Sequence, residues 1–572
     1  MPLGRTSSGL RIQNRVWQCH VIPVTGTEDE AEEVRGFFRY IDRFMNQKQE
    51  QKNGETERRG FLFCKRKSLC LQGINCVVVS VEADVSDGLP GCLLVGYLAS
   101  EVREAQERVR TAIRNLGIRL PPKKITINLS PADIRKEGTG FDLAIAAAIL
   151  TAYGCIPEKA GSEYAFAGEL GLDGSVKGIP GILAMADAAR KSGIPGMFLP
   201  KENAAEASVI RGLKLVPVAS LEEMAGILSG RVAVSASEEA SGNGISGELN
   251  RYDVDFSEVN GQLLLRRAAE VAAAGKHNLL MIGPAGSGKT MVARRIPTIM
   301  PELTMDEAIE ISKLYSISHL LSDRDPILRK RPFRAPHHSV SVQALTGGGA
   351  RPRPGEISLA SGGILFLDEL PEMPRQTLEA LRQPLEERCV TISRVYGTVC
   401  YPADFQLVAA MNPCLCGHFP DRQKCRCTPS QIRRYLGKLS RPILDRIDIC
   451  VEASLASYQD VSGKEENESS ESIRRRVRQA REIQAHRFRE STIRCNGEMT
   501  GKQVRQFCSL GTEESCFMEK IFEEMGLSAR MYDKILKVAR TAADLENSSK
   551  IERKHLSEAV SYVRFKEKYW GR

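Results

Sequence analysis

The sequence predicts an α/β protein of several domains, with a P-loop domain built on a parallel sheet at its centre and a helical domain after it. Three observations predict this fold class. Short β-rich runs alternate with helical stretches over residues 61–228, an apolar run leads into a glycine-rich turn at Gly283, and apolar residues recur at helical spacing after residue 476. The 572 residues allow about four domains, and the 42% of apolar residues can fill several cores.

Three polar stretches divide the chain. Residues 1–60 are dominated by charged and polar side chains, which bury little apolar surface, so we expect a flexible N-terminal extension. Residues 229–250 consist mostly of Ser, Gly, Glu and Ala, which is typical of a linker between domains. A second linker is expected over residues 456–475, where Gly, Lys, Glu, Asn and Ser interrupt the apolar pattern.

The region between the extension and the first linker, residues 61–228, is expected to be a compact α/β domain. Val77–Val81 and Lys124–Leu129 are short β-rich runs and are expected to be strands. Ser100–Leu116 has its apolar residues at helical spacing and is expected to be a helix.

The last region, residues 476–572, is expected to be a bundle of helices. Its apolar residues recur every three or four positions, and Met531, Ile535 and Val538 fall on one helical face. Such a face packs against neighbouring helices.

The most informative segment is the string GPAGSGKT at residues 283–290, which follows the apolar run Asn278–Ile282. A buried strand that passes through a glycine-rich turn into a helix directs backbone N–H groups inward, where they can bind phosphates. We therefore expect Lys289 to contact the β- and γ-phosphates of a nucleotide and Thr290 to hold Mg²⁺. The other nucleotide-binding residues are expected to be Gly283, Gly286, Ser287 and Gly288.

A second acidic element follows the apolar run Ile364–Leu367. Such a run can form a central parallel strand, and ligands bind at the carboxyl ends of strands in open α/β sheets. Asp368 is expected to bind Mg²⁺, and Glu369 is expected to orient the water that attacks ATP. Together with the P loop, these residues predict an ATPase.

Longer strings around these motifs resemble one family. DFSEVNGQ at residues 255–262 and the two phosphate motifs closely resemble the magnesium-chelatase-like AAA+ ATPases of the ComM and YifB group. Four further strings share this resemblance: RAPHHS at 334–339, GGG at 347–349, PGEISL at 354–359 and AAMNPC at 409–414. The resemblance implies an AAA+ core over residues 251–455 and a helical lid over residues 476–572.

The resemblance also implies roles for three residues. Asn412 matches the sensor 1 residue, Arg446 matches the arginine finger that acts on ATP bound to a neighbouring subunit, and Arg530 matches the sensor 2 residue of the lid. An arginine supplied by a neighbour implies a homo-oligomeric ring, usually a hexamer in AAA+ proteins. Spacing alone equally allows Arg446 to pair with Asp445 or Asp448 at the surface, and Arg530 to be a solvated arginine.

The first domain resembles the proteolytic domain of Lon, which has a ribosomal-protein-S5-domain-2-like α/β fold. The resemblance lies in Gly168–Leu170, Gly174–Val176 and Leu199–Asn203. A Ser–Lys peptidase needs a hydroxyl and an amine within hydrogen-bonding distance. Gly140 stands at the serine position and Leu183 at the lysine position, and Thr139 beside them lacks a base, so the domain is expected not to be an active protease. It is expected to serve assembly or substrate engagement.

Two CxC pairs follow Asn412 and supply four thiols: Cys414, Cys416, Cys425 and Cys427. Four thiolates can bind Zn²⁺ in a tetrahedron, although CxxC is the more usual spacing. Four reduced structural thiols are the alternative. The neighbours His337 and His338 are expected to make loop contacts rather than to bind a metal, because adjacent side chains point apart on a strand or helix.

Two segments of the ATPase domain are suited to contact a threaded substrate. In Cys389–Cys400 apolar and polar side chains alternate, as they do in the strands of a hairpin. Gly347–Arg353 is a glycine-rich basic loop. In related ring helicases the corresponding hairpin and loop face the pore, so three arginines are candidates for phosphate contacts in DNA: Arg351, Arg353 and Arg394. Solvation, or pairing between subunits, is the alternative for these side chains.

Composition limits the remaining function classes. The net charge of +9 permits nucleic-acid binding without requiring it, and the 16 cysteines are expected to be reduced in a chain of this size. No apolar run reaches the roughly 20 residues that a membrane-spanning helix needs, so a soluble cytoplasmic protein is expected.

The resemblance therefore implies a ring-shaped ATP-dependent motor that acts on DNA, as a ComM-like branch-migration helicase in DNA processing or recombination. A motor that remodels a protein partner, as the magnesium-chelatase ATPase subunit does, is the alternative.

Overall fold

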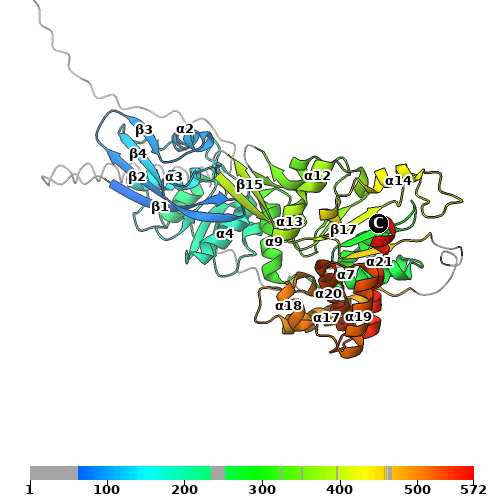
Figure 1. The fold of residues 1–572 in the computed structure, drawn as a ribbon. Coiled ribbons are helices and arrows are strands. Elements are labelled where there is room, and N and C mark those ends of the chain that lie inside the picture. The colour runs from blue at the N-terminus through cyan, green and yellow to red at the C-terminus, as the bar shows by residue number, and fades with distance from the viewer. Residues whose placement is uncertain are drawn as a thin grey trace, which may run out of the picture.

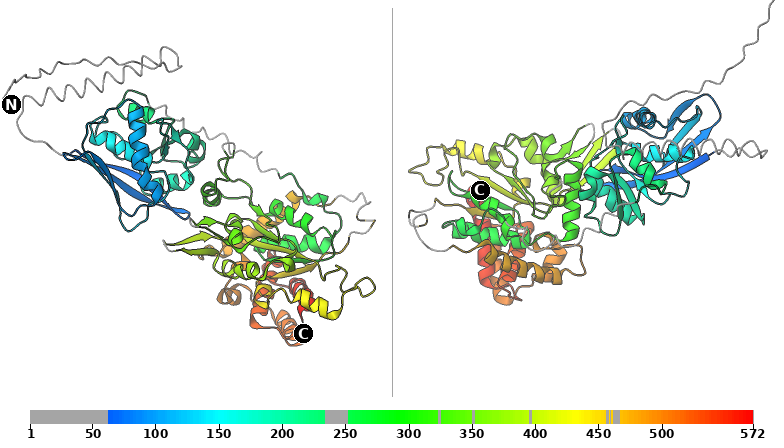
Figure 2. Two further views of the ribbon diagram at one scale, coloured as in Figure 1. Left: turned by 90° about the horizontal axis from the view of Figure 1, so that it is seen from above. Right: turned by 180° about the vertical axis from the view of Figure 1, so that it is seen from behind.

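The computed structural model describes residues 62–233 and 252–571, with gaps at 323–324, 350–351, 395–396, 456–457, 459 and 461–466. The expected extension over residues 1–60, and the part of the expected linker after residue 233, lie outside the described residues. Two α/β domains lie side by side along the length of the molecule, and a helical domain packs beneath the second (Figures 1 and 2).

The first domain contains a mixed seven-stranded sheet in the order β3-β4-β2-β1-β5-β8-β9. The expected strands and helix are present as parts of β2 and β4 and as α2. Helix α3 is buried along its whole length, because α2 and the sheet cover its two sides. The elements are β1 (Leu62–Gln72), β2 (Asn75–Ser86), β3 (Gly91–Val95), α2 (Ser100–Asn115), β4 (Lys124–Ser130), α3 (Asp142–Ala152), β5 (Ala165–Phe166), β6 (Glu169–Leu170), β7 (Val176–Lys177), α4 (Ile182–Lys191), β8 (Gly196–Pro200), α5 (Ala204–Ala207), β9 (Lys214–Val218) and α6 (Leu221–Leu228).

The second domain contains a five-stranded sheet in the order β11-β14-β17-β10-β18, and all of its pairings are parallel, as predicted. The central strands β10, β14 and β17 are fully buried, which matches their unbroken apolar sequences. The strands are β10 (Leu279–Ile282), β11 (Phe333–Arg334), β14 (Ile364–Leu367), β17 (Gln406–Met411) and β18 (Ile449–Glu452), with the hairpins β12 (Gly347–Gly348) to β13 (Arg353–Pro354) and β15 (Cys389–Arg394) to β16 (Gly397–Pro402).

Helices cover this sheet and continue into the C-terminal domain, where Ile535 and Val538 are buried and Met531 is partly buried. One hydrophobic core joins α7, α8 and the sheet to the C-terminal helices, so the helical domain is attached to the ATPase domain through shared packing. The helices are α7 (Leu263–Gly275), α8 (Lys289–Ile299), α9 (Met305–Ile317), α10 (Val342–Thr346), α11 (Glu356–Leu359), α12 (Arg375–Ala380), α13 (Arg382–Glu387), α14 (Pro429–Leu436), α15 (Arg441–Leu444), α17 (Ser470–Arg487), α18 (Gly501–Phe507), α19 (Thr512–Met525), α20 (Ala529–Leu545) and α21 (Arg553–Trp570).

The expected linker over residues 456–475 is too long. Helix α17 already begins at Ser470, because the Ser469 side chain accepts a hydrogen bond from the N–H of Ser472 and caps the helix. The Ser470 hydroxyl is buried and accepts a hydrogen bond from the N–H of Phe256 at 2.8 Å. Serine is typical of linkers and equally typical of helix N-termini, so composition alone placed this boundary too late.

The two α/β domains are in direct contact where α4 packs against α9. Asp187 on α4 lies 2.5 Å from the amine of Lys313 on α9, and both side chains are about 5% exposed or less. Nearby, Gly181 has a φ of +77° and lies against Leu71 and Ile317. None of the helices in the described residues is both long enough and apolar enough to cross a membrane.

Candidate nucleotide site

The carboxyl ends of three central strands meet at one edge of the ATPase sheet. Ile282 pairs with Met411 on one side and with Glu452 on the other, and Leu367 pairs with Ala409. Both neighbours of β10 come later in the chain, so the strand order reverses there, and such a reversal opens a crevice at the strand ends. The residues that follow these strands, the P loop, Asp368 and Asn412, therefore lie around one crevice.

The P loop has the backbone that phosphate binding requires. Gly286 and Gly288 have φ values of +77° and +79°, where a side chain would strain the backbone. Helix α8 begins at Lys289 without a capping side chain, which leaves the N–H groups of its first turn available to an anion.

The Lys289 side chain is buried in this loop and contacts only neutral oxygens among the described residues. Its amine donates hydrogen bonds to the carbonyls of Gly283 and Pro284 at 2.8 and 2.7 Å, and to the Ser287 hydroxyl at 3.3 Å. Burial lowers the pKa of this amine, and the Asp368 carboxylate partly opposes that effect. A cation that is buried without a bound anion is suited to receive phosphate oxygens.

Thr290 and Asp368 fit Mg²⁺. The Thr290 hydroxyl donates to a carboxylate oxygen of Asp368 at 2.8 Å, which brings two hard oxygen ligands together beside the phosphate loop. Mg²⁺ is commonly bound by one or two such protein oxygens and by phosphates.

Glu369 has an unusual backbone and an unexpected partner. Its φ of +50° is rare for a residue other than glycine, and such conformations cluster at functional sites. Its carboxylate lies 2.9 Å from Nδ1 of His338. His337 and His338 lie in a loop and make loop contacts, as expected, and their rings are 4.0 Å apart rather than pointing apart as they would on a strand or helix. His338 belongs to the RAPHHS string, but the sequence gave no sign that it contacts Glu369.

Arg446 and Arg530 meet at a shared carboxylate. Arg446 forms an ion pair with Glu386 on α13 and is 9% exposed, whereas Arg530 lies 3.5 Å from the same carboxylate and is 58% exposed. Among the described residues, the hydrogen-bond and ion-pair partners of the two guanidinium groups are Glu386 and the carbonyl of Pro442, and neither belongs to the P loop. Neither alternative partner of Arg446, Asp445 or Asp448, is the one observed.

Asn412 lies where the sequence places it, directly after β17 and partly exposed. Beside it and the P loop is a cavity of about 440 Å³, a volume suited to a small ligand. Segments far apart in the sequence line this cavity, among them Gln262, Leu264, Pro284, Phe419, Glu452, Phe565 and Tyr569. The two phosphate motifs gave no sign of this cavity, although Gly261 and Gln262 of the DFSEVNGQ string line it beside the P loop.

The hairpin β15–β16 and the glycine-rich loop form one surface. Arg394 donates a hydrogen bond from Nε to the carbonyl of Gly349 at 3.3 Å, and the Tyr401 hydroxyl donates to the carbonyl of Pro352 at 2.7 Å. The side chains of Arg353 and Arg394 are exposed. Arg351 lies outside the described residues.

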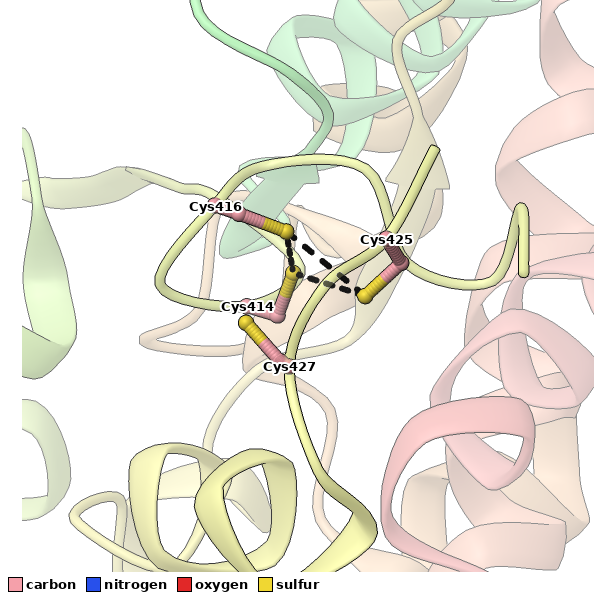
Figure 3. A group of neighbouring side chains, drawn as sticks. All are labelled: Cys414, Cys416, Cys425 and Cys427. Atoms are coloured by element: carbon pink, nitrogen blue, oxygen red, sulfur yellow. Dashed lines mark hydrogen bonds between the residues drawn. The ribbon is translucent and has the colours of Figure 1, made fainter. Parts of the chain in front are cut away.

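The four cysteines after Asn412 come together, and Figure 3 shows their side chains converging from two passes of the chain. The Sγ atom of Cys414 lies 3.4 Å from that of Cys416 and 3.8 Å from that of Cys425, and the last two are 3.6 Å apart. All four sulfurs lie within 4.8 Å of one another. All four thiols are free. The backbone N–H of His418 lowers the pKa of the Cys416 thiol to about 6.

The protease positions of the first domain carry apolar groups. Leu183 lies fully buried on α4, and a Cβ at Gly140 would lie 3.1 Å from the side chain of Ile179. The Thr139 hydroxyl donates a hydrogen bond to the Glu169 carboxylate, so the expectation that Thr139 has no basic group beside it is wrong, although Gly140 and Leu183 supply neither group of a Ser–Lys pair.

Family models for magnesium chelatase match most of the described chain. The model "Magnesium chelatase, subunit ChlI" matches residues 255–461, "Subunit ChlI of Mg-chelatase" matches residues 81–203, and "Magnesium chelatase, subunit ChlI C-terminal" matches residues 467–563. YifB of Escherichia coli K12 is 44% identical over 495 residues, which cover 86% of this chain and 95% of YifB. The chain belongs to the magnesium-chelatase-like family of ComM and YifB.

Two further similarities concern the family and the fold of the first domain. The competence protein ComM of Haemophilus influenzae is 41% identical over 494 residues, covering 86% of this chain and 95% of ComM. The Lon protease of Finegoldia magna is 31% identical over 134 residues, 22% of this chain and 17% of Lon, in keeping with the Lon-like fold. The family indicates an AAA+ ATPase domain that uses ATP and Mg²⁺ and assembles into an oligomer.

Proposed function

We propose that the protein is a hexameric, ATP-driven ring motor that moves DNA strands, as a branch-migration helicase does. The observation that carries this proposal is that the proposed catalytic groups fall into two separate sets. Lys289, Thr290, Asp368, Glu369 and Asn412 surround one crevice, whereas Arg446 and Arg530 meet at Glu386. A neighbouring subunit can therefore supply the missing arginine.

Within one subunit, each polar group has a distinct task in ATP hydrolysis. Lys289 holds the β- and γ-phosphates, and Thr290 with Asp368 holds Mg²⁺, which neutralises charge on the phosphates when bound. Glu369 leaves His338 to orient the attacking water and accept its proton. The Asn412 amide holds that water or the γ-phosphate.

Arg446 acts on ATP bound to the next subunit, where its guanidinium stabilises charge that develops in the transition state. For this it must exchange Glu386 for phosphate. The exposed Arg530 is placed to contact the γ-phosphate from the helical lid. Each hydrolysis event then changes contacts between subunits, which is the step that a ring motor converts into movement.

The surface formed by the hairpin and the glycine-rich loop is proposed to contact DNA through Arg353 and Arg394, with Arg351 as a third candidate. Exposed arginines on glycine-rich backbone can follow a phosphate backbone without reading its sequence. The relative from Haemophilus influenzae is named the competence protein ComM, which supports the proposed role on DNA.

The second candidate function is an ATPase that remodels a protein partner. The three family models support it, since each bears the name of a magnesium-chelatase subunit. In that case the Lon-like domain would engage the partner, and DNA would leave the rate of hydrolysis unchanged.

The decisive experiment measures ATP hydrolysis with single-stranded, duplex and four-way-junction DNA, followed by junction unwinding. We expect DNA to stimulate hydrolysis. The double variant Arg353→Ala/Arg394→Ala should release about two fewer ions on binding DNA, which is measured as a smaller slope of log affinity against log salt concentration. Arg478→Ala, which removes an exposed arginine of the lid domain, is the matched control. Absence of DNA binding and of stimulation at moderate salt contradicts the helicase proposal.

A further inference from the structure

The loop that carries the four cysteines lies between β17 and α14 and forms part of the nucleotide cavity. Phe419 and Pro420 of this loop line the cavity together with Pro284 of the P loop and Tyr569 of α21. The Phe419 ring packs edge-on against Tyr569, with 6.0 Å between ring centroids. The position of Phe419 therefore shapes the site that would hold the nucleoside.

The loop has little apolar packing of its own. The residues between its cysteine pairs are mostly exposed and polar, including His418, Asp421, Gln423 and Lys424. A segment of this composition does not bury enough surface to fix its conformation. A cross-link between the cysteines would add to the contacts that hold Phe419 against Tyr569 and the core.

The cysteine cluster has the dimensions of a zinc site. Four thiolates at about 2.3 Å from Zn²⁺ in a tetrahedron lie about 3.8 Å from one another. The sulfurs of Cys414, Cys416 and Cys425 have spacings of 3.4 to 3.8 Å, and that of Cys427 lies within 4.8 Å of them. The same spacings are far longer than the bond of about 2.05 Å in a disulfide. The set of four sulfurs also leaves no open position for a substrate, which is typical of a structural zinc site.

The cluster is joined directly to the cavity wall. The backbone N–H of Phe419 donates to Sγ of Cys414 at 3.4 Å, and such N–H contacts orient metal-bound thiolates. Gly417, with a φ of +80°, is buried against the P loop, and a Cβ there would lie 3.9 Å from Pro284 Cα and Ala285 N. On the other side of the cluster, Thr428 follows Cys427 and caps α14.

We infer that Cys414, Cys416, Cys425 and Cys427 bind one structural Zn²⁺ ion, and that this ion fixes Phe419 in the wall of the nucleotide cavity. Zinc loss therefore weakens nucleotide binding without removing any group that contacts phosphate. The effect on the nucleotide rests on the proposed ATP binding, whereas zinc binding does not depend on it. Four metal-free reduced thiols, or a disulfide formed on oxidation, are the competing states.

The test begins with the zinc content of the full chain, purified under reducing conditions without chelators. We expect one zinc per chain in the wild type and in Cys516→Ser, a control that removes an exposed cysteine of α19. Cys425→Ser/Cys427→Ser loses the metal, and Cys427→His retains it, because histidine is also a zinc ligand. Replacement by Co²⁺ should give the visible absorption of a tetrahedral thiolate site.

The second measurement is the binding of a fluorescent ATP analogue to the same four proteins. The double serine variant should bind it about 5- to 20-fold more weakly, and Cys427→His should bind it nearly as the wild type does. A wild type that takes up no zinc when the metal is in excess overturns the inference. Equal nucleotide affinity in the zinc-free variant, shown by circular dichroism to be folded, overturns the coupling to the cavity.

The two proposals fail in distinguishable ways. If the wild type holds zinc but no protein in the series binds nucleotide, ATP binding fails and the metal site stands. If nucleotide binds and zinc does not, the metal site fails and the ATPase stands.

Discussion

The two α/β domains differ in whether the buried charged side chain beside a glycine-rich turn has an oppositely charged partner. In the first domain, the buried Asp142 accepts hydrogen bonds from Arg108 at 2.8 and 2.9 Å and from the N–H of Leu170 at 3.2 Å. In the ATPase domain, the buried Lys289 contacts only neutral oxygens among the described residues. A charge whose partner is already present stabilises the fold, whereas a charge without one is available to a ligand. Related layers of strand and helix can thus serve structure in one domain and chemistry in the other.

The strongest test of this contrast is Lys289→Ala. We expect ATP binding to weaken at least about 100-fold, because the phosphates lose their charged hydrogen-bond donor. Its companion Glu369→Gln should still bind ATP but barely hydrolyse it, because the amide cannot accept a proton from water. Equilibrium binding and steady-state turnover separate the two effects. Normal turnover in Glu369→Gln removes Glu369 from the mechanism.

Arg446→Ala tests whether the site is completed by a neighbour. Turnover should fall about 1000-fold while ATP affinity stays near the wild-type value, as for other arginine fingers. Mixing this variant with Lys289→Ala should restore part of the activity, since a mixed ring contains interfaces with an intact Lys289 site and an intact Arg446. Two inactive variants that stay inactive when mixed argue for action within one chain.

Arg108→Ala tests the other half of the comparison. It leaves Asp142 buried with its charge unmatched, which should lower the free energy of unfolding of the first domain by about 3–5 kcal/mol. Arg110→Ala, which breaks a surface pair on the same helix, should cost less than about 1 kcal/mol. Urea unfolding followed by hydrogen exchange in α3 measures both. ATP affinity should not change, because neither residue lies near the nucleotide cavity.

Asp187→Ala has the smallest expected effect and tests whether the two domains act as one unit. Among the described residues it leaves the buried Lys313 with the carboxylate of Glu310 alone, and we expect the domain contact to weaken by about 1–3 kcal/mol. Limited proteolysis between residues 229 and 251 should then become faster. Lys191→Ala, which removes a more exposed partner of Asp187, is the milder control.

Acid should act on the same contact. Burial raises the pKa of Asp187, but hydrogen bonds from Lys191, Lys313 and Arg190 outweigh it and bring the pKa to about 2, below the ordinary value of 3.8. Because the folded-state pKa is the lower one, the stabilisation is complete above about pH 4 and is lost as the pH falls towards 2. Asp187→Ala should remove this part of the acid response.

The sequence by itself predicted the P loop, the strand before Asp368 and several of the helices and strands. These features depend on residues that are adjacent in the chain, whose backbone preferences and periodicity can be read directly. The expected α2, β2, β4 and the buried face of α20 are present for this reason. The start of α17 was misplaced because serine caps helices as readily as it fills linkers.

Only the tertiary structure decided which distant side chains meet. Glu369 contacts His338, Arg446 and Arg530 share Glu386, and Phe419 packs against Tyr569. The cysteine cluster likewise needs a loop that turns back on itself, because CxC spacing alone does not fix where four sulfurs lie. Such contacts depend on strand order and on the packing of distant elements against one another. Neither can be read from residues that are adjacent in the chain. The sequence thus determined the phosphate chemistry, and the packing decided what surrounds it.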